Sequence, residues 1–233
     1  MSSIKDMFDC LTPVDIKHEL KRYGNMDSDG GYIFSESELL DSKYIYSYGI
    51  GPLARQIVFD YEMADLGKKI YMYDGTISGP ALNHQNFFFT KENVDSSNLY
   101  THIVDNGHEN ENNITAQIDI ENSEYEMFSN CEDKVFDVFS HMNVEFHGLH
   151  DFSESKFKTL KKLSDKYYAY HIHVNNWKYK LKDGYPEVIE VSYIRKDRLD
   201  FKPETYSGEY PIEGLDVKNN PENTDPVINW WRK

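Results

Sequence analysis

The sequence predicts a single α/β domain whose mainly parallel β-sheet is flanked by helices. Short apolar runs alternate with amphipathic stretches along the chain, which is the pattern of β–α–β units. A chain of 233 residues is long enough to bury one sizeable core. Its composition, 39% hydrophobic and 15% aromatic, is that of a folded protein. These observations favour one α/β core with peripheral additions.

Seven strands and four helical stretches are expected along this core. The strands fall within residues 43–48, 69–73, 99–104, 114–120, 135–146, 167–174 and 186–193. Helices are expected over residues 3–23, divided or restarted at Pro13, over 53–66, from 123 onward, and over 153–166.

Three parts are expected along the chain. Residues 1–42 are predicted to form an N-terminal helical and loop cap, and residues 43–199 the sheet-containing core. Residues 200–233 carry four prolines among polar residues, which favours an extended tail packed on the same domain. Trp230 and Trp231 are its expected anchors.

The charge and cysteine content narrow the partners and the compartment. A net charge of −15 repels a phosphate backbone, so nucleic acid is a poor candidate partner. The two cysteines, Cys10 and Cys131, form neither a disulfide framework nor a paired motif. No secretion signal and no apolar stretch of the roughly 18 residues that a membrane span needs is visible. We therefore expect a cytoplasmic protein without a membrane span.

A glycine bend carries the first functional signal. Gly49-Ile50-Gly51 lies directly after the first expected strand and before a helix, where glycines let the backbone turn sharply beside a ligand. Asp74 follows the next strand, where a carboxylate can accept hydrogen bonds from ribose hydroxyls. Two ordinary turns are the alternative, but the pair favours a nucleoside site in a Rossmann-like domain.

The residues after the bend indicate which nucleoside it holds. A dinucleotide fingerprint needs a third glycine, but Pro52, Leu53, Ala54 and Arg55 follow Gly51, and only Ala54 can substitute for that glycine. A cofactor without a pyrophosphate, such as S-adenosyl-L-methionine, suits the shorter motif better.

The order of the short motifs resembles the FkbM-like S-adenosylmethionine-dependent methyltransferases over residues 20–198. The motifs are Arg22-Tyr23-Gly24, Asp29-Gly30-Gly31-Tyr32, Tyr46-Ser47-Tyr48-Gly49-Ile50-Gly51, Phe59-Asp60, Tyr73-Asp74-Gly75-Thr76, Asp119-Ile120-Glu121, Glu145-Phe146-His147-Gly148 and Pro186-Glu187-Val188-Ile189-Glu190-Val191. Asn122 departs from the pattern, because that group usually has glycine there, and this puts the local turn in doubt.

The resemblance implies a class I methyltransferase fold, with seven strands and the seventh antiparallel at the end. It implies O-methylation of a small molecule, often a sugar, here a sugar or nucleotide-activated sugar of surface polysaccharide biosynthesis. Gly49 and Gly51 would face the methionine part of the cofactor, and Asp74 with Gly75 the ribose. Asp105, ending the expected third strand, would approach the adenine, although an ordinary turn aspartate explains it equally well.

Methyl transfer to a hydroxyl requires that the acceptor oxygen is aligned with the methyl group. It also requires a base or a metal that activates the hydroxyl, and we expect this group at the strand ends. The candidates are Asp119, Glu121, Glu145, His147, His150, His171 and His173. Asp119 and His147 end neighbouring strands and are the expected catalytic residues. With His173 they form a possible metal set, which suits Mn, Fe or Zn better than Mg. In the alternative, His147 alone is the base.

Basic residues are few, so their clusters are candidate phosphate sites. They are Lys178, Lys180, Lys182, Arg195, Lys196 and Arg198, and they suit an anionic acceptor. A solvated loop that balances local acids is the simpler alternative. The expected partner is a small-molecule acceptor, and a homo-oligomer stays open. A nicotinamide-dependent sugar oxidoreductase and a catalytically silent binding relative are the competing functions.

Overall fold

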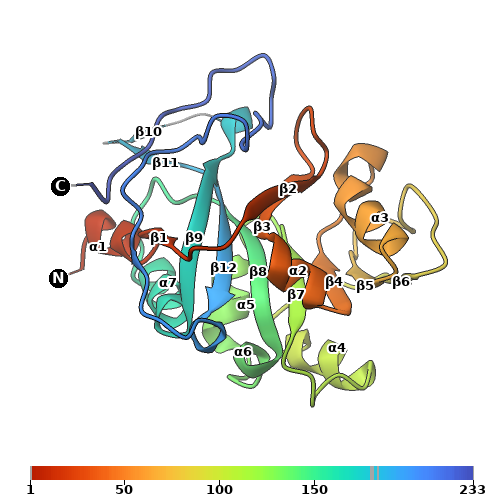
Figure 1. Cartoon of the computed structure of the whole chain (residues 1–233). Coiled ribbons are helices and arrows are strands. Elements are labelled where there is room, and N and C mark those ends of the chain that lie inside the picture. Colours follow the sequence, from red (N-terminus) through yellow and green to blue (C-terminus); the bar gives the residue numbers. More distant parts are fainter. Residues whose placement is uncertain (1, 179–180, 183, 233) are drawn as a thin grey trace.

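A seven-stranded β-sheet runs through the middle of the molecule (Figure 1). The structure is a computed structural model and describes residues 2–178, 181–182 and 184–232. In their order across the sheet, the strands are β6 (Phe87–Thr90), β5 (Lys69–Tyr73), β4 (Tyr44–Tyr48), β7 (Ile114–Ile118), β8 (Phe139–Phe146), β12 (Ile189–Arg195) and β9 (Tyr167–Val174). The α/β class with a mainly parallel sheet and flanking helices is therefore confirmed.

One strand runs against the others. β4, β5, β6, β7 and β8 pair in parallel, whereas β12 pairs antiparallel with both β8 and β9. The antiparallel strand thus lies between β8 and β9, not at the end of the sheet as the resemblance implied. This insertion separates side chains on β8 from those on β9 by the width of a strand.

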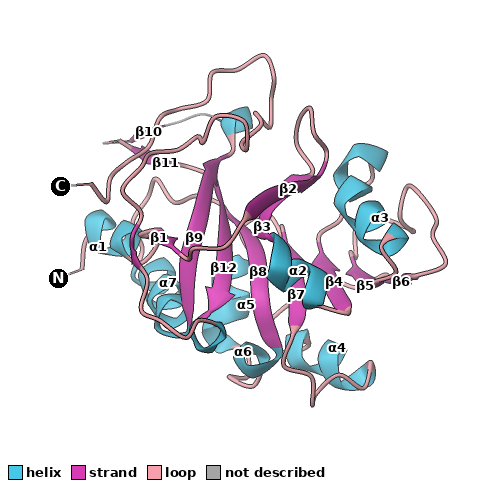
Figure 2. Cartoon of the chain, viewed as in Figure 1, coloured by secondary structure: helices cyan, strands magenta, loops and turns pink. Residues whose placement is uncertain are grey.

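Helices cover one face of the sheet, and a hairpin with two helices covers the other (Figure 2). The first face packs against α1 (Ile4–Asp9), α4 (Leu99–Asp105), α5 (Glu124–Asn130) and α7 (Glu154–Lys166). The second face packs against the β2–β3 hairpin (Leu20–Gly24 and Gly31–Ser35), α2 (Glu36–Asp41) and α3 (Val58–Asp65). The helices at 53–66, 123 onward and 153–166 are confirmed, the first of them beginning as a 3-10 turn, η1 (Ala54–Ile57).

The remaining elements are short. They are β1 (Val14–Asp15), α6 (Val135–Val138), η2 (Asn176–Lys178), β10 (Leu181–Lys182), β11 (Tyr185–Pro186), η3 (Lys196–Arg198) and β13 (Glu204–Thr205). None of the helices within the described ranges combines the length and apolar character that crossing a membrane requires.

The sheet face under the hairpin is unusually polar. Between β8, β12 and β9 it carries buried histidine, asparagine, serine and glutamate side chains. The Ser192 hydroxyl donates to the Ile33 carbonyl at 2.6 Å, and the Gln117 amide donates to the Tyr32 hydroxyl at 3.1 Å. Because buried polar groups need partners, these bonds fix the hairpin over this half of the sheet.

The expected strand at 99–104 is wrong, since these residues form helix α4. Its buried residues Leu99, His102 and Ile103 have the spacing of one helix face. The third parallel strand is β6, whose three phenylalanines the sequence presents as an aromatic cluster. β-branched residues at 99–104 favoured a strand locally, but packing on the sheet decides for a helix.

The expected helix over 3–23 is also wrong beyond its first turns. α1 ends at Asp9, before Pro13, which cannot donate a helical hydrogen bond. Leu20–Gly24 then pairs antiparallel with Gly31–Ser35, so residues 1–42 are mainly a strand hairpin with two short helices. The alternation of its side chains between two buried faces explains why a strand replaces the helix.

The C-terminal tail contacts β9 of the core through Tyr210 and Asp216 and also forms a separate two-stranded sheet. β13 pairs with β1, and Tyr210 and Trp231 are buried. The Trp230 indole donates to the Phe8 carbonyl at 3.2 Å, which ties the tail to α1. Both ends of the chain therefore meet on one side of the molecule (Figure 1).

Candidate functional site

Polar and glycine residues gather where the parallel strands end. Gly49 follows β4, Asp74 follows β5, Asp119 follows β7 and His147 follows β8. Because parallel strands end at one edge of the sheet, the structure brings these four sequence-predicted residues to the same rim. Asn175, which the sequence did not single out, joins them after β9.

A cavity of about 430 Å³ opens beside the glycine bend. It is lined by Gly49, Gly51, Pro52, Gln56, Tyr73, Asp74, Thr76, Asn93, Val94, Asp119, Ile120, Glu121 and Ser123. The Gly51 amide donates to Asp74 Oδ2 at 3.0 Å, and the Thr76 amide to Asp74 Oδ1 at 2.8 Å. The bend and the carboxylate thus form one wall of this cavity. We call it the cofactor cavity, after the role proposed for it below.

Gly49 lies where no other residue fits. Its φ is +76°, and a Cβ atom there would overlap the backbone carbonyl oxygen of Asp119. The absence of a side chain allows the loops after β4 and β7 to touch at the base of the cavity. Gly75 lies outside the lining, and its amide donates to Asn93 Oδ1 at 3.0 Å.

Asp105 does not belong to this site. It is an exposed residue at the end of α4 and lines neither of the cavities described in this section. The prediction that it ends a strand is therefore wrong, and its place at the end of α4 does not favour the predicted contact with the adenine. Asn93 and Val94, which follow β6, occupy that side of the cofactor cavity.

Asn122, the departure from the family pattern, preserves the turn after β7. Its φ is +81°, in the left-handed region that glycine adopts easily and asparagine tolerates. Glu121 also has a positive φ, +51°. This turn directs Asp119 and Glu121 toward the same space.

A second cavity, of about 490 Å³, adjoins the first. It is lined by Asp29, Arg55, Gln56, Asp119, Glu121, Glu145, His147, Asn175, Trp177 and Val188, and we call it the acceptor cavity. Gln56, Asp119 and Glu121 line both cavities and form the boundary between them. Arg22 braces one wall, because its guanidinium donates to the Asn25 and Ser28 carbonyls of the loop that holds Asp29.

At this boundary one imidazole faces several carboxylates. His147 Nε2 lies 3.2 Å from Glu145 Oε1, 3.5 Å from Glu121 Oε2 and 3.9 Å from Asp119 Oδ1. On its other side, His147 Nδ1 lies 3.0 Å from Glu124 Oε1. Asp119, Glu145 and His147 offer ligand atoms within 4.8 Å of one another, and we call these three residues the junction cluster.

The surroundings shift the pKa values of the junction cluster. Burial alone would lower the pKa of His147, but its contacts with Glu124 and Glu145 outweigh burial and raise it. Burial raises the pKa of Asp119 and of Glu145, and the carboxylates repel one another, while His147 opposes both shifts. The cluster thus resembles the acid–base groups that enzymes use, in which neighbouring groups are held away from their ordinary pKa values.

Sequence reasoning missed Glu124. Its side chain is fully buried at the start of α5, where it accepts from the Asn122 amide at 3.2 Å and faces His147. The only available signal was an acidic residue in a first helical turn, which usually means a favourable charge at a helix N-terminus. Its contact with His147 arises from the way α5 packs beside β8.

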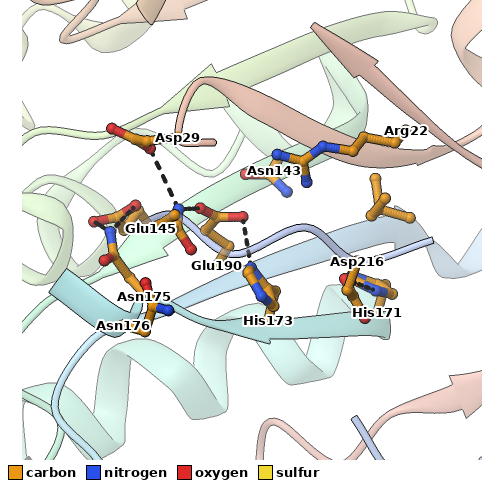
Figure 3. A network of polar contacts seen from close by, with 12 residues as sticks. Arg22, Asp29, Asn143, Glu145, His171, His173, Asn175, Asn176, Glu190 and Asp216 are labelled. Carbon is orange, nitrogen blue, oxygen red and sulfur yellow. Dashed lines mark hydrogen bonds and ion pairs between the residues drawn. The ribbon is translucent and has the colours of Figure 1, made fainter. Parts of the chain in front are cut away.

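His173 does not join Asp119 and His147, so that predicted set is not formed. In the sheet register, Glu190 on β12 stands between His173 on β9 and Glu145 on β8. His173 Nε2 instead lies 3.2 Å from Asp225 Oδ2 of the tail. Its Nδ1 lies 3.7 Å from Glu190 Oε2, and Figure 3 shows the contact between these two side chains. The inserted antiparallel strand is the physical reason.

The other candidate histidines also have structural partners. His171 Nε2 lies 3.0 Å from the fully buried Asp216 Oδ1 of the tail, as Figure 3 shows. His150 Nε2 lies 3.2 Å from Asp151. These two residues lie outside the junction cluster.

The structure describes the side chains of three residues of the expected basic clusters, and each has a partner of its own. Arg195 pairs with Asp197 and Arg198 with Glu38, while Lys196 lies over the Tyr168 ring. Since β12 runs antiparallel, its last residues lie at the sheet edge opposite the cavities. Lys180 and the side chains of Lys178 and Lys182 lie outside the described residues.

Comparisons with known proteins do not assign this site to a family. A scan against protein-family models finds no match for the chain, and a search of curated proteins finds none either.

Proposed function

We propose that the chain is an S-adenosylmethionine-dependent O-methyltransferase that acts on a hydroxyl of a small molecule, namely a sugar or nucleotide-activated sugar. One observation carries the proposal: two adjoining cavities share a wall, and the junction cluster stands at their boundary. Such a layout suits a reaction in which a group passes from one bound molecule to another. The resemblance to the FkbM-like enzymes and their class I fold supports the same proposal.

The cofactor cavity has the chemistry that an adenosyl group requires. Its volume lies in the ~300–1,000 Å³ range of small-molecule sites. Asp74 accepts hydrogen bonds from Gly51 and Thr76, and its remaining lone pairs can accept from ribose hydroxyls. The glycine bend gives the ligand close access to the backbone.

When bound, the cofactor supplies a methyl group on a positively charged sulfur. The residues of the chain then have three tasks: to place the acceptor oxygen in line with that methyl group, to exclude water and to take up the hydroxyl proton. Asp119 lines both cavities and would take up the proton, and His147, whose pKa is raised, lies directly beside it and would stabilise the Asp119 carboxylate. Gly49, Gly51 and Asp74 would hold this cofactor, and it would supply the methyl group to the acceptor oxygen.

The acceptor cavity supports a polyhydroxylated ligand. Asp29, Glu145 and Asn175 offer hydrogen-bonding oxygens and amide groups, and Trp177 offers a half-exposed aromatic surface. Several polar groups around one flat apolar face suit a ring that carries hydroxyls on its edge and C–H groups on its face.

Ligand-dependent melting tests the cofactor, and methyl transfer tests the reaction. S-adenosylhomocysteine at about 100 times its dissociation constant should add about 2.7 kcal/mol of stability, whereas NAD should add none. Methyl-labelled cofactor should then label a sugar from a panel of methyl pyranosides and nucleotide sugars. Stabilisation by NAD alone would favour the oxidoreductase, and S-adenosylhomocysteine binding without any transfer would favour a silent binding relative.

A further inference from the structure

We propose that the junction cluster is a metal site, in which Asp119, Glu145 and His147 bind one divalent transition-metal ion. The ligand set differs from the sequence-predicted one, because Glu145 stands in place of His173. Binding of the ion is a property of these side chains and does not depend on the proposed methyl transfer.

The distances suit a shared ion. Ligand atoms on one ion lie at most about 4.4 Å apart, since each lies about 2.0–2.2 Å from the metal. His147 Nε2 lies 3.2 Å from Glu145 Oε1 and 3.9 Å from Asp119 Oδ1, so both separations meet this limit. The three residues come from the ends of the neighbouring strands β7 and β8, whose backbones fix their positions.

The local charge calls for a cation. Four carboxylates, those of Asp119, Glu121, Glu124 and Glu145, lie within 4.0 Å of one imidazole. Glu121 is exposed, but Asp119 is partly buried and Glu124 and Glu145 are buried. A protonated His147 offsets only one charge, and buried charges need compensation. Asp119 Oδ1 is also buried without accepting a hydrogen bond from any described residue, which leaves an acceptor that a metal can satisfy.

Glu124 orients the imidazole for this role. Metal-binding histidines almost always donate their second ring N–H to a carboxylate or a carbonyl, which fixes the tautomer and the ring. Glu124 Oε1 lies 3.0 Å from His147 Nδ1, and the Glu124 side chain is fully buried. The Nδ1 proton is thereby held on the Glu124 side, and Nε2 is left free to bind a metal between Asp119 and Glu145.

The donors indicate both the type of metal and its open side. One imidazole with two carboxylates suits Mn²⁺, Fe²⁺ or Zn²⁺ better than Mg²⁺, which prefers oxygen ligands alone. Three protein ligands leave further positions for other oxygens. All three ligands line the acceptor cavity, so an acceptor hydroxyl can occupy one of those positions. This last role, unlike the site itself, rests on the proposed function.

The test is a calorimetric titration of the chelator-treated full chain with MnCl₂, repeated with ZnCl₂. We expect one ion per chain, and at least tenfold weaker binding in Asp119→Asn and His147→Gln. Glu124→Gln should weaken binding by about 10–100-fold, the usual effect of losing an outer partner. Glu126→Gln is the matched control, because Glu126 lies on the same helix but is exposed and outside the cluster, and it should bind as the wild type does.

A second measurement keeps the test decisive if a variant fails to fold. Electron spin-echo spectra of Mn²⁺ on the wild type should show coupling to an imidazole nitrogen. No saturable uptake of either ion by the wild type, or uptake without nitrogen coupling, would overturn the metal site. Titration of S-adenosylhomocysteine on the same samples separates the two proposals: a chain that binds it but takes up no metal loses only the metal site.

Discussion

The two cavities are built in different ways, although they share a wall. The cofactor cavity draws just over half of its lining from residues 49–76, which follow β4 and include α3 and β5, and hydrogen bonds to backbone amides close this segment. The acceptor cavity collects residues from positions 29 to 188, and buried polar side chains hold them together. Local chain geometry therefore shapes the first cavity, and long-range packing shapes the second. Substitutions should be able to damage either one separately.

Gly49→Ala should have the largest effect, because Gly49 lines the cofactor cavity and touches Asp119, which lines both cavities. A Cβ atom would overlap the Asp119 carbonyl, and the left-handed backbone adds about 1–2 kcal/mol of strain. We expect roughly 100-fold weaker binding of S-adenosylhomocysteine and a loss of about 2–4 kcal/mol in unfolding free energy. Calorimetry and urea unfolding measure the two quantities.

Gly51→Ala is the control for that change. It has a similar φ, +67°, but its Cβ would meet only the side chain of Gln56, which can move. The free energy of unfolding of Gly51→Ala should therefore fall only by the backbone strain of about 1–2 kcal/mol. Equal losses in the two variants would contradict the account of Gly49 as the contact between two loops.

Asp74→Asn should damage the cofactor cavity alone. The amide nitrogen of asparagine cannot accept from the Gly51 or Thr76 amides, and hydrogen bonds to a charged group contribute about 1.5–3 kcal/mol. We expect S-adenosylhomocysteine to bind about 10–100-fold more weakly by calorimetry. Asp105→Asn should leave binding unchanged, and an effect there would restore the role predicted for Asp105.

The same division explains how much the sequence predicts. The glycine bend and Asp74 are found from local order, because a strand, a turn and a helix follow one another within a few residues. The sheet edge also follows, since Asp119 and His147 come directly after strands. These are properties of neighbouring residues, and the sequence displays them directly.

The predictions from the sequence fail where contacts between residues far apart in the chain determine the structure. His173 is excluded from the junction cluster because β12, later in the chain, inserts between β8 and β9. Glu124 reaches His147 through helix packing, which no spacing rule encodes. The 99–104 segment contains β-branched residues that suit a strand, and burial against the sheet overrides that preference.

The stability of the folded protein should depend on pH through His173. Burial alone would lower its pKa, but Asp225, Glu190 and Asp216 outweigh burial and raise it from 6.5 to about 10. Because the folded pKa exceeds the unfolded one, this stabilisation is complete below pH 6.5 and is lost as the pH rises toward 10. We expect a loss on the order of 2 kcal/mol in urea unfolding between about pH 7 and pH 9.

His173→Gln isolates this contribution from the other groups that titrate in the same range. It should be less stable than the wild type at pH 7, and the difference should shrink as the pH rises. A difference that is independent of pH would mean that His173 is neutral in the folded protein. The affinity of the cofactor cavity for S-adenosylhomocysteine should stay the same, because none of its lining residues contacts His173.

Trp177→Ala should have the smallest effect and should be confined to the acceptor cavity. The indole is 51% exposed, so its loss leaves no cavity in the core, and the free energy of unfolding should barely change. A stacked ring contributes about 0.5–1.5 kcal/mol, so the KM for the acceptor should rise by up to about tenfold. Binding of S-adenosylhomocysteine should not change, since Trp177 does not line the cofactor cavity.

Phe201→Ala removes another exposed aromatic ring that lines neither cavity, and it should leave KM as in the wild type. If Trp177→Ala weakened cofactor binding while sparing KM, the two cavities would have to exchange their assigned ligands.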